Sequence, residues 1–170
     1  MAAACRSVAL ARQRRPGDRA HLRRAQPGSS GPVVRLLDTD VCIEILRGNQ
    51  TLIERRLATP DDVATSWITA CELAYGAAKS ARPKQNQKLV DGFLATVAVH
   101  GLDRNAAGHF GGLKARLERT GRTLADADLL IAAIALAQQA VLVTGNRRHY
   151  ERIPGLRMED WMHGTANDER

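Results

Sequence analysis

The chain has 170 residues, 44% of them hydrophobic, which is enough for one domain with an apolar core. Its formal net charge is +7, but residues 1–32 hold seven Arg and one Asp, so the remainder is nearly neutral and the charge alone identifies no nucleic-acid partner. Three separated cysteines without CxxC spacing indicate neither a disulfide framework nor a zinc site and favour a cytoplasmic protein, and no apolar run reaches the roughly 18–20 residues that span a membrane.

Residues 1–32 are rich in Arg, Ala and Pro and include the sequence PGSSGP, a composition that predicts a disordered extension. Three roles for this extension stay open: a targeting segment, a basic arm that binds RNA phosphates, and an upstream extension without a role. Residues 164–170 are predicted to be a polar tail. Residues 33–163 are therefore expected to form the folded domain.

Short apolar segments that contain β-branched residues predict strands at residues 33–37, 63–68, 97–102 and 141–144. The segments between them have helical spacing or composition, at residues 41–46, 52–57, 69–78, 89–97, 106–119 and 125–139. The last of these is almost entirely apolar and must be buried. Strands that alternate with helices predict an α/β fold around a mainly parallel sheet.

Polar residues follow two of the predicted strands, and two further acids lie near helix starts. Asp38 ends the first strand and Asn146 follows the last one, whereas Glu72 and Asp128 open apolar helices. In parallel sheets, ligands bind outside the carboxyl ends of the strands. Carboxylates next to apolar segments are costly unless they are paired, and a divalent cation is a common partner. If Asp38, Glu72 and Asp128 converge, they predict a metal-dependent hydrolytic site.

Each acid also has a structural explanation that the sequence leaves open. Asp38 can cap the following helix. Glu72 completes a capping box that begins at Thr69, and Asp126 completes a similar box that begins at Thr123, whereas Asp128 has no such explanation. The run LLDTD also matches the opening of haloacid-dehalogenase-like phosphatases, which is a further alternative.

Four motifs, in this order, carry a resemblance that covers residues 33–161: LLDTDVCIEIL, ITACELAYGAAKS, ADADLLIAAIALA and VLVTGNRRHYERIPGLRMEDW. Together they resemble the VapC-type PIN-domain ribonuclease toxins of bacterial toxin–antitoxin pairs. The resemblance implies a PIN-like α/β/α sandwich and an endoribonuclease that depends on Mg²⁺ or Mn²⁺. It further implies an RNA substrate, a cognate antitoxin and a homodimer.

The resemblance also implies roles for individual residues. Asp38, Glu72 and Asp128 match the family's acids, with Asp38 and Asp128 as the direct metal ligands. Thr39 matches the hydroxyl residue after the first acid.

Asn146 stands where many PIN domains have a fourth acid, and Asp126 is the candidate substitute, although Asp126 and Asp128 point to different sides of a regular helix. The chain is therefore expected to hold one metal ion firmly. The alternative is a catalytically weak PIN domain that binds RNA or protein. The missing fourth acid favours this alternative, and the three intact acids count more strongly against it.

Overall fold

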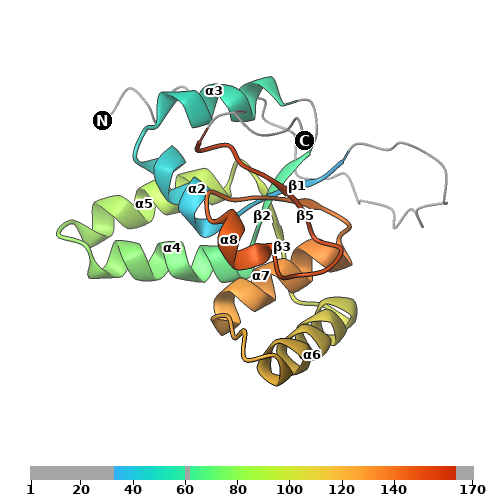
Figure 1. Ribbon diagram of the computed structural model, residues 1–170. Helices are drawn as coiled ribbons and strands as arrows, with labels where there is room; N and C mark the ends of the chain where they lie inside the picture. The colour runs from blue at the N-terminus through green and yellow to red at the C-terminus, as the bar shows by residue number, and fades with distance from the viewer. Residues whose placement is uncertain (1–32, 60–61, 164–170) are drawn as a thin grey trace.

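The structure is a computed structural model that describes residues 33–59 and 62–163. The predicted extension at residues 1–32 and the predicted tail at residues 164–170 lie outside the described residues. Figure 1 shows a central sheet with helices on both sides. Among the described residues, no helix combines the length and hydropathy that a membrane span requires.

All five strands run parallel, in the spatial order β3-β2-β1-β4-β5, which confirms the predicted α/β class and the parallel sheet. The strands are β1 (Arg35–Leu37), β2 (Val63–Ser66), β3 (Ala98–His100), β4 (Val141–Val143) and β5 (Arg157–Glu159). The helices are α2 (Thr39–Leu46), α3 (Gln50–Ala58), α4 (Trp67–Lys79), α5 (Pro83–Leu94), α6 (Arg104–Arg119), α7 (Asp126–Ala137) and α8 (Arg147–Tyr150).

The two faces of the sheet carry two separate apolar clusters, because successive side chains of a strand point to opposite faces. Leu36 and Leu142, which are paired in register, pack on one face with residues of α6 and α7. Leu37 and Val143, the next pair, pack on the other face with residues of α2, α3 and α5. Figure 1 shows α6 and α7 on one side of the sheet and α3 on the other.

The helix α7 is the most buried helix of the domain, as its apolar sequence predicted. Leu129 and residues 131–135 are at most 1% exposed. The burial of residues 129 and 131–135 fixes where the first turn of the helix, which carries Asp126 and Asp128, lies relative to the sheet.

Two elements were not predicted from the sequence, the short helix α8 and the edge strand β5. They have four and three residues, too few for hydrophobic periodicity to detect. Both follow β4, and α8 extends the chain directly from Asn146, so the missed helix belongs to the edge of the sheet where the candidate site residues were expected.

Candidate functional site

Asp38 lies at the centre of the candidate site, where the carboxyl ends of β1 and β4 meet. Its backbone N–H donates to the carbonyl of Val143, 2.9 Å away, and its side chain is the N-cap of α2. Oδ1 accepts from the backbone N–H of Thr39 at 2.8 Å, and Oδ2 accepts from the hydroxyl of Thr144 at 2.8 Å. The capping explanation is therefore confirmed for Asp38. It leaves part of the carboxylate free, because a carboxylate has about four lone-pair positions.

Asp38 is only 6% exposed, and its charge is poorly compensated within the protein. Burial, followed by the charge of Asp40, raises the pKa of Asp38 to about 6, against the hydrogen bonds from Thr144 and Thr39 and the nearby Tyr150 hydroxyl, which lower it. Among the described residues, no Lys, Arg or His forms an ion pair with this carboxylate. A buried carboxylate in this condition fits a hard cation with oxygen ligands.

Glu72 is linked to Asp38 through Thr39. The hydroxyl of Thr39 donates to Oε2 of Glu72 over 2.5 Å, and it also lies 3.4 Å from the hydroxyl of Thr69. Glu72 is exposed to solvent, so burial does not force it to take a partner. The capping box predicted for Glu72 is wrong, because Ser66 caps α4 and accepts from the backbone N–H of Thr69, which places Glu72 in the second turn.

Asp128 is half-buried in the first turn of α7 and faces the short helix α8. Its Oδ2 lies 3.4 Å from Nδ1 of His149, and the same imidazole nitrogen lies 2.7 Å from the side-chain nitrogen of Asn146. The backbone N–H of Asn146 donates to the Thr144 hydroxyl at 3.0 Å. A continuous series of polar contacts thus joins Asp38 to Asp128 through Thr144, Asn146 and His149.

The capping box predicted for Asp126 is also wrong. Ala125 is the N-cap of α7 and makes no side-chain cap hydrogen bond. Both carboxylate oxygens of Asp126 instead accept from Lys114 on α6, at 2.7 and 2.8 Å. Asp126 is therefore directed to the helix on its own side of the sheet, which leaves it poorly suited to replace a fourth acid.

The convergence of Asp38, Glu72 and Asp128 on one ion remains a prediction. Within the described ranges, no three His, Cys, Asp or Glu side chains are already grouped so as to hold a metal ion. Asp38 and Asp128 nevertheless both lie near Tyr150. Burial is the largest cause that raises the pKa of Tyr150, and the charges of these two acids are the next largest. The Tyr150 hydroxyl is buried and has no hydrogen-bond partner among the described residues.

Sequence reasoning missed three polar residues of this site: Thr144, His149 and Tyr150. Thr144 ends a strand next to Asn146, so its position was a usable signal. The other two lie on α8, and nothing in the pattern RRHY distinguishes a buried tyrosine hydroxyl from an ordinary core aromatic.

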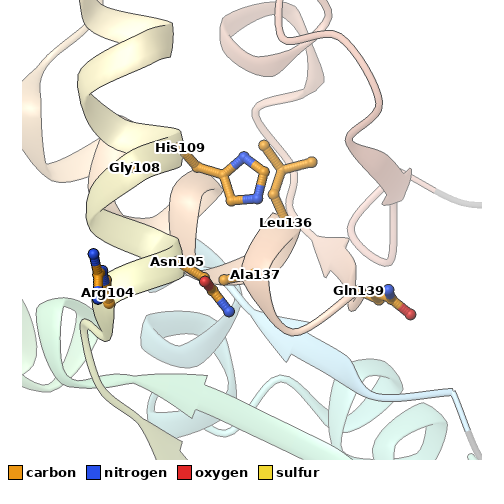
Figure 2. Close-up of a pocket in the computed structure, with 7 residues that line it drawn as sticks. All are labelled: Arg104, Asn105, Gly108, His109, Leu136, Ala137 and Gln139. Carbon is orange, nitrogen blue, oxygen red and sulfur yellow. The ribbon is translucent and has the colours of Figure 1, made fainter. Parts of the chain in front are cut away.

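A surface depression lies away from these acids, between the start of α6 and the end of α7 (Figure 2). Arg104, His109, Leu136 and Gln139 are among the residues that line it, and none of its lining residues is an acid. Because Asp128 lies in the first turn of α7 and the depression lies at the end of that helix, near Ala137, roughly 13–14 Å of helix separates the depression from the candidate site.

Comparisons with known proteins identify the family. The family model described as PIN domain matches residues 35–156. A tRNA(fMet)-specific endonuclease VapC of Salmonella typhimurium is 39% identical over 127 residues, which are 74% of this chain and 96% of that protein. Its namesake in Shigella flexneri is 36% identical over 127 residues, with the same coverage.

Solved structures agree with this match. A chain in the VapBC2 structure of Rickettsia felis, bound to a DNA fragment from the promoter, has a TM-score of 0.71 and 32% identity, and the match covers 76% of this chain and 99% of that one. A chain in the DNA-bound VapBC structure of Salmonella typhimurium has a TM-score of 0.71 and 40% identity, over 76% of this chain and 98% of that one. The chain therefore belongs to the PIN-domain family and, within it, to the VapC ribonuclease type.

Proposed function

We propose that this protein is a metal-dependent endoribonuclease that acts as the toxin of a toxin–antitoxin pair in the cytoplasm. The observation that carries the proposal is the buried carboxylate of Asp38 at the carboxyl ends of β1 and β4, with Asp128 near enough that the charges of both acids raise the pKa of Tyr150. Support comes from relatives named as ribonucleases and as tRNA(fMet)-specific endonucleases. Membership of the PIN family argues against the phosphatase alternative.

The donor set suits Mg²⁺ or Mn²⁺, because both ions prefer carboxylate, carbonyl and water oxygens. When bound, such an ion supplies the positive charge that a phosphodiester needs during hydrolysis and acidifies a water molecule. In this proposal Asp38 and Asp128 hold the ion, and Glu72, positioned by Thr39, orients water. Asn146 contributes an uncharged amide, so the site holds one ion firmly. Arg147 and Arg148, which follow Asn146, are the candidates for contacts with RNA phosphates.

The direct test is RNA cleavage by purified protein, freed of any partner, with Mg²⁺ or Mn²⁺. Asp38→Asn and Asp128→Asn should each lower the cleavage rate by more than about 100-fold, because even groups one shell beyond a metal cost about 10- to 100-fold when removed. Transfer RNA is the first substrate to try, because two relatives are named tRNA(fMet)-specific endonucleases.

Two further substitutions control this test. Asp91→Asn alters an exposed acid of α5 that pairs with Gln87, and it should leave cleavage unchanged. Asp126→Asn should also leave the metal dependence unchanged, because Lys114 occupies both oxygens of Asp126. Cleavage that survives both Asp38→Asn and Asp128→Asn, or a parent that cuts no RNA with any metal, would refute the nuclease proposal.

The exposure of Glu72 and the neutral side chain of Asn146 favour a second candidate, a catalytically weak domain that binds RNA without cutting it. Binding measured beside cleavage separates the two functions: retention of RNA on the parent without products supports the second.

The proposed antitoxin and homodimer have their own tests. Solved relatives are VapBC complexes, which supports a cognate antitoxin for this chain. Conditional expression should arrest growth, and co-expression of the partner should relieve the arrest. Light scattering of the isolated protein tests the homodimer.

A further inference from the structure

The hydroxyl of Tyr150 is a buried donor that makes no well-formed hydrogen bond in the structure. Tyr150 is the last residue of α8 and is 1% exposed, and its ring packs in the cluster that contains Leu36, Leu142 and Ile153. Among the described residues, no acceptor forms a hydrogen bond of good geometry with its hydroxyl. The carboxylate of Asp38 nevertheless lies close enough that the hydroxyl lowers the pKa of Asp38 and Asp38 raises the pKa of Tyr150. An unpaired hydroxyl in an apolar interior is unfavourable. A hydrogen-bond partner for the Tyr150 hydroxyl is therefore expected in at least one state of the protein, such as the metal-bound state.

The groups that face this hydroxyl are the acids of the candidate site. Burial raises the pKa of Tyr150, and the charges of Asp38 and Asp128 follow as the next largest causes, ahead of the direct approach of the hydroxyl to the Asp38 carboxylate. A phenol has an ordinary pKa of about 10, so at neutral pH the hydroxyl carries its proton and donates to these anions. Its neighbour His149 lies against Asp128, so the four-residue helix α8 reaches both acids through consecutive side chains.

Asp38 has room for this donor. The backbone N–H of Thr39 and the hydroxyl of Thr144 take one lone pair on each of its oxygens. Of the four positions that a carboxylate offers, about two remain. If the Tyr150 hydroxyl were the third donor, a single lone-pair position would remain on the Asp38 carboxylate. The three hydrogen bonds would then fix the direction in which that lone pair points. The torsion that turns an Asp carboxylate has a broad energy well, so a bound cation can bring an oxygen into line with the phenol.

Burial limits what the tyrosine does. A side chain that is 1% exposed cannot touch a polymeric substrate, so Tyr150 is not a catalytic residue. We infer that Tyr150 is a positioning residue of the metal site: its hydroxyl donates to Asp38 and, together with Thr39 and Thr144, directs the remaining lone pair toward a divalent cation. This inference rests on the proposed function only in taking the cation to be the nuclease's metal.

The substitution Tyr150→Phe tests the inference, because it removes the hydroxyl and keeps the ring. The first readout is metal binding without RNA, measured by calorimetry and by the rise in Tm on titration with Mg²⁺ or Mn²⁺. The variant should bind either ion about 10- to 100-fold more weakly, the usual effect of losing a group that orients a metal ligand. Its Tm without metal should equal or exceed that of the parent, because an unpaired buried donor is gone.

The second readout is RNA cleavage. At a fixed metal concentration below saturation, kcat should fall while KM for RNA stays unchanged, because the hydroxyl does not touch the substrate. Tyr75→Phe is the matched control, since Tyr75 is 66% exposed and should change neither quantity. Thr144→Val removes another donor to the same carboxylate and should weaken metal binding in the same way, which keeps the inference testable if Tyr150→Phe fails to fold.

Three outcomes would overturn the inference: parental metal affinity in Tyr150→Phe, weakened binding that merely follows a lower Tm without metal, or a parent that binds neither ion. Failure of the proposed function gives a different result. A parent that binds the metal but cuts no RNA refutes the nuclease, while the affinities of the parent and Tyr150→Phe still decide the role of Tyr150.

Discussion

At the scale of single residues, Gly145 shows how closely the loop after β4 packs against the candidate site. Its N–H donates to Oδ2 of Asp40 over 2.9 Å. A Cβ at this position would lie 3.0 Å from the same oxygen and 2.5 Å from Sδ of Met162. The need for glycine here arises from close approach, since its φ is outside the left-handed region. The contact holds Asn146 in place, one residue further on.

Gly145→Ala should therefore lower the free energy of unfolding by about 1–3 kcal/mol, the usual cost of overpacking. Met162 is flexible and 36% exposed, so adding Met162→Ala should recover part of this loss. Urea unfolding measures both effects. Gly92→Ala, in an open position of α5, is the control that should not destabilise the protein. Parental stability in Gly145→Ala would contradict the close packing.

At the scale of elements, α6 carries three glycines at positions where the surrounding structure leaves room for a larger side chain. Gly108, Gly111 and Gly112 have no atom within 4 Å of a built Cβ. Glycine within a helix costs roughly 0.5–1 kcal/mol relative to alanine. The helix is secured elsewhere, by the side chain of Asp103 at its N-cap and by buried Leu113.

Alanine at any of these three positions should stabilise the domain by about 0.5–1 kcal/mol, as measured by chemical denaturation. Gly121 is the contrasting position on the same helix end. Its φ is +64°, so Gly121→Ala should be destabilising. A loss of stability or a changed oligomeric state in the α6 variants would refute the prediction and would indicate that another chain packs on this face.

At the scale of the whole molecule, one ion pair connects the start of the domain to its end. Arg35 on β1 donates through two nitrogens to Glu159 on β5, both at 2.9 Å, across the intervening β4. Trp161 donates to the same carboxylate at 3.0 Å. Burial tends to raise the pKa of Glu159, but the hydrogen bonds from Arg35 and Trp161 outweigh it and hold the pKa below its ordinary value.

A lowered carboxylate pKa stabilises the fold above the pKa of the unfolded chain, and this contribution is lost as the pH falls through the folded value. The parent should therefore be more stable than Glu159→Gln at neutral pH, and the gap should close below the ordinary pKa of glutamate. Urea unfolding as a function of pH measures the gap. A gap that is constant at every pH would show that the charge of Glu159 does not contribute.

The sequence was sufficient to predict the parallel sheet and the positions of Asp38 and Asn146, because strand ends follow from hydrophobic pattern and turn residues. The sequence was insufficient where several neighbouring residues can each serve as the N-cap of a helix. Ser66 and Thr69 can both cap α4, and the end of β2 decides in favour of Ser66. Hydroxyl contacts such as those of Thr144 and Tyr150 depend on packing between distant segments, which no local pattern contains.

The hydrogen bond between Asp38 and Thr144 has a consequence for synthesis, because it joins residues 106 positions apart. A nascent chain that ends before β4 has neither Thr144 nor the helix that carries His149 and Tyr150. Since ribosomes add roughly 5–20 residues per second and domains fold as units, the acids remain separate for most of translation. Assembly of the candidate site is therefore a late event, completed only after most of the chain has left the ribosome.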